Sequence, residues 1–227
     1  MILHEFSTGG MAMKKHFFIG LIITILISFN ACGTSEHSSK NTYAENLKAL
    51  EKHAITPAEN FEFIPDEINP DGLALYAYHG TEEIVVIPNE VNGKKIVSIV
   101  NQAFGAGSGV KAVRISDSVE RISTGFRDNE ELQYVIFGSG LKEIWEYSFW
   151  GCHSLERVEL NEGLIRIEYN AFANMDSLSY IYVPGTVTEI ISAAIHIEPE
   201  NFVMAGKAGS AAEDFAKLLR YTFEVVE

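Results

Sequence analysis

A 23-residue period runs through the second half of the chain and constrains its fold more than any other feature. The same columns continue upstream with small changes in length, which gives five repeats between about Ile84 and Ile195. A fixed period of about 20–29 residues with apolar columns is typical of a solenoid of the leucine-rich kind. Four columns keep the period: Leu132, Leu155 and Leu178; Phe137, Leu160 and Val183; Ile144, Ile167 and Ile190; Phe149, Phe172 and Ile195.

Each repeat predicts one turn of that solenoid. A first segment of pattern L-x-x-V-x-F alternates as a strand does, and glycines such as Gly138 and Gly163 then turn the chain. A second segment, such as residues 141–144, sends two more apolar side chains inward, and a small residue followed by an aromatic one closes the turn. No repeat can bury its apolar side alone, so we expect the turns to stack at about 4.8 Å into one core.

The order of residues within a repeat resembles the surface-antigen type (BspA-like) of bacterial leucine-rich repeat. The segment Ile144-Trp-Glu-Tyr-Ser-Phe149-Trp-Gly-Cys152-His-Ser-Leu155 follows that family's pattern closely. Residues 206–216 resemble the closing unit that often follows such arrays. The resemblance implies a right-handed, β-rich superhelix of short parallel strands with short helical or 3-10 turns. It also implies adhesion or host-protein binding for some relatives, within a functionally diverse family.

The N-terminal sequence predicts an exported protein. Residues 1–12 are a leader without an interpretable pattern, and residues 13–31 combine two lysines with a largely apolar stretch, as a signal peptide does. Cys32, within Phe-Asn-Ala-Cys-Gly, resembles the lipidated cysteine of bacterial lipoproteins. We therefore predict a lipid anchor at Cys32 and a location on the cell envelope or cell surface. An ordinary cleaved signal with an incidental cysteine is the alternative.

The regions around the solenoid predict a tether and two caps. Residues 32–42 are polar and predict a flexible tether. Residues 43–82 predict an N-terminal cap, with a weakly amphipathic helix over 43–52 and two strands after it, which would cover the open edge of the first turn. Residues 83–198 contain the five repeats. Residues 199–227 predict a C-terminal cap, in which a helix starts at the capping box Ser210-Ala-Ala-Glu213 and a last strand follows.

The charge and the motif content argue against several functions. A formal net charge of −14 disfavours nucleic-acid binding, which needs Lys and Arg against phosphates. The sequence contains no nucleophile elbow, phosphate loop or zinc signature, and its histidines keep no metal-ligand spacing. We therefore expect no catalytic residue, no metal and no other cofactor, and a protein that is not an enzyme. Cys152 is expected to be a buried, inert thiol.

Two outward columns of the repeats differ in character. The column of the second segment alternates in sign, which predicts structural pairs between neighbouring strands. Its members are Ser98, Arg121, Glu143, Arg166 and Glu189. The column of the first segment carries Tyr, Ile and Arg, residue types that are common in protein contact surfaces. The candidate partner-binding residues are Tyr134, Ile136, Arg157, Tyr180 and Tyr182.

These features predict a non-enzymatic, lipid-anchored surface protein. It would bind a protein or glycan partner through the outward face of its first segments, and it would contact the membrane through the lipid. The alternative is a structural scaffold of the envelope without a soluble ligand, and the tyrosines of the first segments would then only suit a strand.

Overall fold

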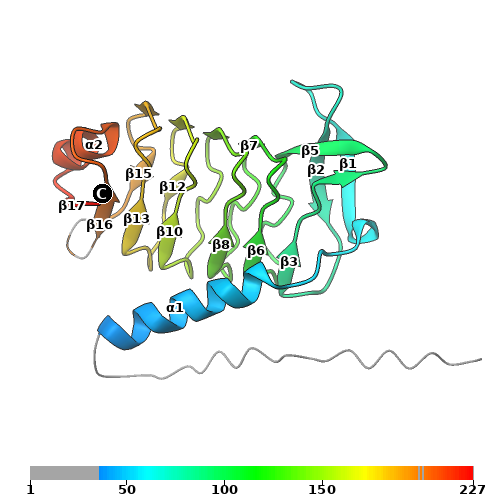
Figure 1. Cartoon of the computed structure of the whole chain (residues 1–227), viewed down its shortest axis with the longest axis horizontal. Helices are drawn as coiled ribbons and strands as arrows, with labels where there is room; N and C mark the ends of the chain where they lie inside the picture. The colour runs from blue at the N-terminus through cyan, green and yellow to red at the C-terminus, as the bar shows by residue number, and fades with distance from the viewer. Residues whose placement is uncertain (1–35, 199, 201, 227) are drawn as a thin grey trace, which may run out of the picture. The chain divides into compact units, whose positions relative to one another are not determined.

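In the computed structural model, which describes residues 36–198, 200 and 202–226, the chain winds as a solenoid of short parallel strands (Figure 1). The predicted fold class is confirmed. The predicted signal peptide and Cys32 lie outside the described residues. No helix among the residues that the structure describes is long and apolar enough to cross a membrane.

The first segments form strands that stack in parallel along one face. Seven of them follow one another, in two hydrogen-bonded sheets of order β3-β6-β8 and β10-β13-β16-β17. Central residues such as Val135 and Val158 are buried, and the residues on either side are more exposed. The strands are β3 (Ile84–Val86), β6 (Ala112–Arg114), β8 (Tyr134–Ile136), β10 (Arg157–Glu159), β13 (Tyr180–Tyr182), β16 (Val203–Gly206) and β17 (Thr222–Val225).

The second segments form a longer sheet that joins the turns on another side. Its order is β1-β2-β5-β7-β9-β11-β14, with β4 paired antiparallel to β5. On the third side, the described residues form one short sheet, in which β12 (Phe172–Ala173) pairs with β15 (Ile195–His196). The strands of the long sheet are β1 (Phe61–Pro65), β2 (Leu73–Tyr78), β4 (Glu90–Val91), β5 (Lys94–Ile99), β7 (Arg121–Ile122), β9 (Glu143–Ile144), β11 (Arg166–Ile167) and β14 (Glu189–Ile190).

An aromatic ladder fills the core at the third side, as the repeat columns predict. Phe104, Phe126, Phe149 and Phe172 are fully buried. Their ring centroids are 5.1, 4.9 and 5.1 Å apart in sequence order, and the planes of successive rings differ by 10° or less. Each ring is therefore packed on both faces by the turns above and below it, and the turns share one continuous core.

The structure has about two more turns than the five counted from the sequence. Val203 and Met204 of β16 pair in register with Tyr180 and Ile181, 23 residues earlier, so the period continues past Ile195. Strand β17 then pairs with β16, and a helix lies between them in the chain. That helix interrupts the apolar columns, which is why a count based on the period stops too early.

A long helix precedes the solenoid. Helix α1 (Glu36–Glu51) includes residues 36–42, where the sequence predicts a flexible tether. It lies along the first-segment strands β3 to β10 (Figure 1). The contacts with these strands provide the stabilisation that its own weak amphipathicity does not. A short 3-10 helix, η1 (Ala58–Asn60), then leads into β1, which pairs antiparallel with β2.

The predicted helix and strand are present at the C-terminal end. Helix α2 (Ala211–Leu219) begins at Ser210, whose Oγ accepts a hydrogen bond of 3.4 Å from the backbone N–H of Glu213. The Glu213 carboxylate accepts from the backbone N–H of Gly209 at 2.6 Å. The predicted helix start is thus confirmed. That the terminal elements at either end act as caps stays a prediction.

Candidate functional site

The five candidate residues lie on three first-segment strands. Tyr134 and Ile136 are on β8, Arg157 is on β10, and Tyr180 and Tyr182 are on β13. Arg157 is in direct register with Tyr180. All five side chains are partly exposed and alternate with fully buried central residues, so they belong to the outward face of the strands.

Helix α1 covers the N-terminal part of this face. The Asn46 amide Nδ2 donates a hydrogen bond of 2.8 Å to the Tyr134 hydroxyl, and the ring of Tyr43 lies 5.7 Å from the ring of Tyr134. Leu50 is buried in a small apolar cluster outside the main core, against which Tyr134 and Ile136 also pack. Tyr134 and Ile136 are therefore contacts of α1 as well as partly exposed residues, and their role in binding a partner stays a prediction.

This contact could not be predicted from the sequence, because no pattern in the helix identifies the strands against which it packs. The helix has few apolar residues. Of the side chains that contact the strands, Tyr43 is aromatic, Asn46 is polar, and Leu50 is apolar. The Tyr and Ile of β8 are themselves a signal that could have suggested a covering segment, since partly buried aromatic side chains on a strand often serve packing.

Arg157 lies at the boundary between the covered and the uncovered part of the face. Its guanidinium carbon is 3.5 Å from the centroid of the Tyr180 ring and 5.6 Å from that of Tyr43. Its Nε donates a hydrogen bond of 2.8 Å to the carboxylate of Glu159. Burial and the nearby Glu159 raise the pKa of Tyr43, and the positive charge of Arg157 opposes the shift. The guanidinium is thus held between two rings and a carboxylate.

Beyond Arg157 the face continues over β13, β16 and β17. Tyr180 is in register with Val203, and Val203 with Thr222. The Tyr182 hydroxyl donates a hydrogen bond of 2.8 Å to Glu162. Burial and this hydrogen bond to a carboxylate raise the pKa of Tyr182 to about 12. We call the residues Arg157, Tyr180, Tyr182, Val203, Thr222 and Glu224 the open face.

The charged column of the second segment is aligned as predicted. Most of the predicted ion pairs within it, however, are not formed. The register places Ser98, Arg121, Glu143, Arg166 and Glu189 side by side. Among the described residues, Arg166 and Glu189 form an ion pair across the column, with Nε and Oε2 3.2 Å apart. The Glu143 carboxylate accepts instead from the Trp145 indole N–H at 2.6 Å.

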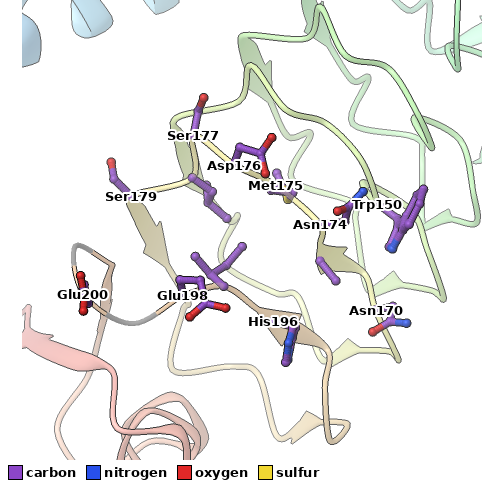
Figure 2. A pocket seen from close by; sticks show the side chains of 13 residues that line it. Trp150, Asn170, Asn174, Met175, Asp176, Ser177, Ser179, His196, Glu198 and Glu200 are labelled. Carbon is purple, nitrogen blue, oxygen red and sulfur yellow. The ribbon is translucent and has the colours of Figure 1, made fainter.

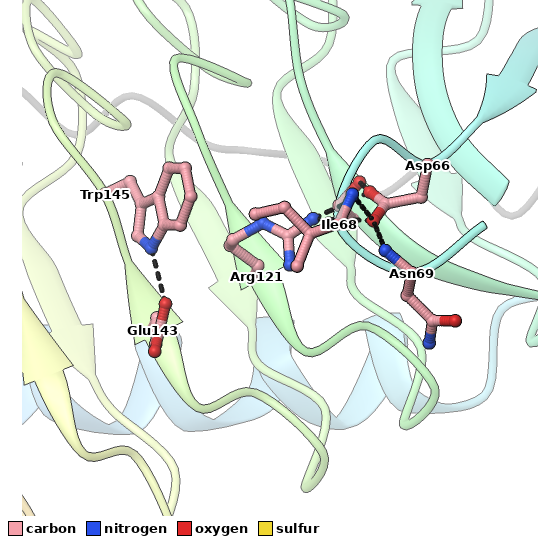
Figure 3. A network of polar contacts seen from close by, with 7 residues as sticks. Asp66, Ile68, Asn69, Arg121, Glu143 and Trp145 are labelled. Atoms are coloured by element: carbon pink, nitrogen blue, oxygen red, sulfur yellow. Dashed lines mark hydrogen bonds and ion pairs between the residues drawn. The ribbon is translucent and has the colours of Figure 1, made fainter. Parts of the chain in front are cut away.

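Arg121 finds its partner outside the repeats (Figure 3). Its Nη2 donates to both carboxylate oxygens of Asp66, at 2.9 and 2.7 Å, and its guanidinium carbon is 5.1 Å from the Trp145 ring centroid. Burial opposes ionisation of Asp66. Hydrogen bonds from Ser98, from the backbone N–H of Asn69 and from Arg121 nevertheless lower the pKa of this carboxyl. The pair is a structural element near the start of the solenoid.

The chemistry available elsewhere is limited. The Cys152 thiol is fully buried and donates a hydrogen bond of 3.2 Å to the backbone carbonyl of Phe126, and burial raises its pKa. A thiol in this state is a poor nucleophile. Within residues 36–198, 200 and 202–226, no group of three or more His, Cys, Asp or Glu side chains could hold a metal ion.

The fold has close counterparts among solved structures. A leucine-rich repeat protein of T. pallidum is 27% identical, with a TM-score of 0.63 over 67% of this chain and 71% of that one. A leucine-rich repeat protein of Bacteroides ovatus is 22% identical, with a TM-score of 0.50, and is matched over 38% of its length. The pneumococcal vaccine antigen PcpA is 15% identical, with a TM-score of 0.53, and is matched over 44% of its length. The chain thus spans less than half of the last two proteins. No curated protein matches the chain.

The sequence itself matches a known family. Residues 75–197, more than half of the chain, match six copies of the repeat described as "BspA type Leucine rich repeat region". This range contains the aromatic ladder and the aligned strands of all three sides. The chain therefore belongs to the BspA-type leucine-rich repeat family.

Proposed function

We propose that this protein is a non-enzymatic, surface-exposed binding protein that recognises a protein partner through the open face. Its family supports this proposal, because leucine-rich repeat proteins are in general binding modules. The similarity of its fold to a vaccine antigen supports surface exposure. The signal-like residues 13–31 and the Cys32 that follows them support export and a lipid anchor.

The observation that carries the proposal is the stacked pair of Arg157 and Tyr180 beside Tyr182. Tyrosine and arginine supply much of the binding energy in measured interfaces. The Arg157 guanidinium, 3.5 Å from the ring centroid of Tyr180, restricts both side chains before any partner arrives. The hydrogen bond to Glu162 restricts Tyr182 in the same way. Less conformational entropy is then lost on binding.

The charges of the open face indicate what kind of partner fits it. Glu159, Glu162 and Glu224 surround the tyrosines, and Arg157 is the basic member of the group. The chain as a whole carries a formal net charge of −14. We therefore expect a protein surface that offers Lys or Arg around an apolar or aromatic centre, with association that slows as salt is added.

A site-specific cross-linking experiment tests the proposal. A photo-reactive amino acid replaces Tyr182 in the full chain, displayed on cells, and a matched probe replaces Tyr169, an exposed tyrosine of another column (43% exposed). We expect one protein to be captured from position 182 and not from position 169. The double variant Tyr180→Ser/Tyr182→Ser should bind that purified protein at least tenfold more weakly and keep the wild-type melting temperature.

Four results would contradict parts of the proposal. Equal capture from both positions, or normal binding by the folded double variant, would place the contact elsewhere. Absence of any captured protein would favour the envelope scaffold instead. Failure of a labelled fatty acid to mark the wild type would exclude the lipid anchor, and Cys32→Ala is the control that should lose the label.

A further inference from the structure

A cavity of about 960 Å³ opens around β12 and β15, on the third side of the solenoid (Figure 2). It forms where two neighbouring turns separate. Strands β12 and β15 pair over only two residues each, Phe172 with Ile195 and Ala173 with His196. Beyond these pairs the two segments diverge, as Figure 2 shows, and side chains of both line the space between them. Its volume is in the range of ligand pockets.

Several polar side chains in this cavity have unused hydrogen-bond donors and acceptors. Asn170, Asn174 and His196 line it, and within the described part of the chain these side chains make no hydrogen bond. Each amide offers two donor hydrogens and one acceptor oxygen, and the imidazole offers one of each when neutral. Met175 and Leu178 form a buried apolar floor between them. The cavity thus combines a buried apolar base with polar side chains, of which Asn170 is partly buried and Asn174 and His196 are exposed.

The indole of Trp150 lines the cavity and is held by a neighbouring cation. The guanidinium carbon of Arg127 lies 5.3 Å from the Trp150 ring and 5.2 Å from the Tyr147 ring. Tyr147 in turn packs edge-on against Tyr169, with ring centroids 5.9 Å apart. This chain of contacts restricts the indole, so a ligand that stacks on it loses little entropy.

We infer that this cavity is a second binding site, and that it takes a neutral glycan. A pyranose ring presents an apolar C–H face, which stacks on an indole, and an edge of hydroxyl groups, which both donate to and accept from amides. The carboxylates in the lining belong to Asp176, Glu198 and Glu200, and Oδ2 of Asp176 lies 2.9 Å from Nδ1 of His153. They accept hydrogen bonds from hydroxyls, and they repel phosphate, sulfate and sialic acid groups.

This site is independent of the proposed protein-binding face. Its lining is centred on β12 and β15 and extends to Ser179, which precedes β13, and to Glu200, which precedes β16. None of the residues of the open face lines it. Loss of one binding activity should therefore leave the other intact, and the two proposals can fail separately.

The test uses the full chain, purified in detergent, against an array of defined oligosaccharides. The array contains neutral chains of hexoses and N-acetylhexosamines, sialylated and sulfated chains, and a set of lysine-rich peptides. Affinities for the oligosaccharides that bind are then measured by titration calorimetry. We expect binding to neutral chains and to neither class of anionic chain.

Two kinds of variant connect binding to the cavity. Trp150→Ala removes the stacking ring, and Asn174→Gly removes an amide while the backbone φ of 55° remains favourable for glycine. Each should weaken binding at least tenfold. Trp145→Ala is the matched control, because Trp145 is the other tryptophan of the same turn and donates to Glu143, outside the cavity lining. It should bind as the wild type does.

The possible outcomes all decide the question. Binding of neutral oligosaccharides that is lost in Trp150→Ala and Asn174→Gly and kept in Trp145→Ala supports the site. No binding to any neutral chain, binding to anionic chains or to the peptides alone, or equal affinity in all variants overturns it. Should Trp150→Ala fail to fold, Asn170→Gly joins Asn174→Gly, and the two glycine variants decide on the same criterion.

Discussion

The ion pair of Asp66 and Arg121 provides a sharp test of how the start of the solenoid is held together. The side chains are 2% and 11% exposed, respectively. The Asp66 carboxylate also accepts from the Ser98 hydroxyl at 2.5 Å and from the backbone N–H groups of Ile68 and Asn69 at 3.1 and 2.7 Å (Figure 3). The perturbation is Asp66→Asn, which keeps the shape of the side chain and removes its charge.

The expected loss in the free energy of unfolding follows from the charge that Asp66→Asn leaves unpaired. Arg121 stays charged and buried without its counter-ion, and breaking a buried pair from one side costs about 3–5 kcal/mol. Arg121→Met should cost less, because the Asp66 carboxylate keeps its hydrogen bonds to Ser98 and to two backbone N–H groups. The control is Lys111→Met. Its ion pair with Glu83 is as short, 2.7 Å, but exposed, so the loss should be about 0–1 kcal/mol.

The assay is urea unfolding followed by tryptophan fluorescence, at pH 7 and at decreasing pH. The folded protein holds the pKa of Asp66 below its value in the unfolded chain. The stabilisation is therefore complete above the unfolded pKa of about 3.9 and is lost as the pH falls through the folded value. The difference in unfolding free energy between wild type and Asp66→Asn should accordingly shrink when the pH is lowered from 7 to below 4.

Two results would refute this reasoning. If Asp66→Asn and Lys111→Met lowered the free energy of unfolding equally at pH 7, burial would not decide the strength of these ion pairs. If the cost of Asp66→Asn were independent of pH down to the acid unfolding of the protein, the ionised carboxylate would not be the stabilising species.

Four further outcomes are expected. Phe149→Ala should lower the free energy of unfolding by about 3–5 kcal/mol in urea titrations, because its ring is stacked between two others, and an unchanged midpoint would contradict the ladder. Glu189→Arg should cost about 1 kcal/mol beside Arg166, and less in high salt; a salt-independent cost would mean that the two charges do not interact. Leu50→Ala should speed amide exchange in α1 at least tenfold with little change in the core, whereas protection equal to wild type would contradict its packing. Cys152 should react with iodoacetamide only in denaturant, since burial raises its pKa, and labelling of the folded protein, detected by mass spectrometry, would be contrary to that.

The repeat columns show why much of the fold could be predicted from the sequence. Each turn has its apolar residues at the same positions. All of them are buried when equivalent residues of successive turns stack on one another. The alignment of Arg166 with Glu189 and the ladder of Phe104, Phe126, Phe149 and Phe172 follow from that period alone. Of the candidate site, the outward direction of Tyr180 and Tyr182 could be predicted for the same reason.

The features of this chain that can be predicted from its sequence are therefore those that recur from turn to turn. The contacts between a repeat and a segment that does not repeat emerge only in three dimensions. Tyr43 meets Arg157 across 114 residues, and Asp66 meets Arg121 across 55. The cavity beside Trp150 opens where the pairing of β12 with β15 stops. A periodic pattern specifies which positions face inward, because burial repeats with the turn. It does not specify which single side chain a helix or loop will bring to the surface of the array, because that contact depends on the path of the chain in three dimensions.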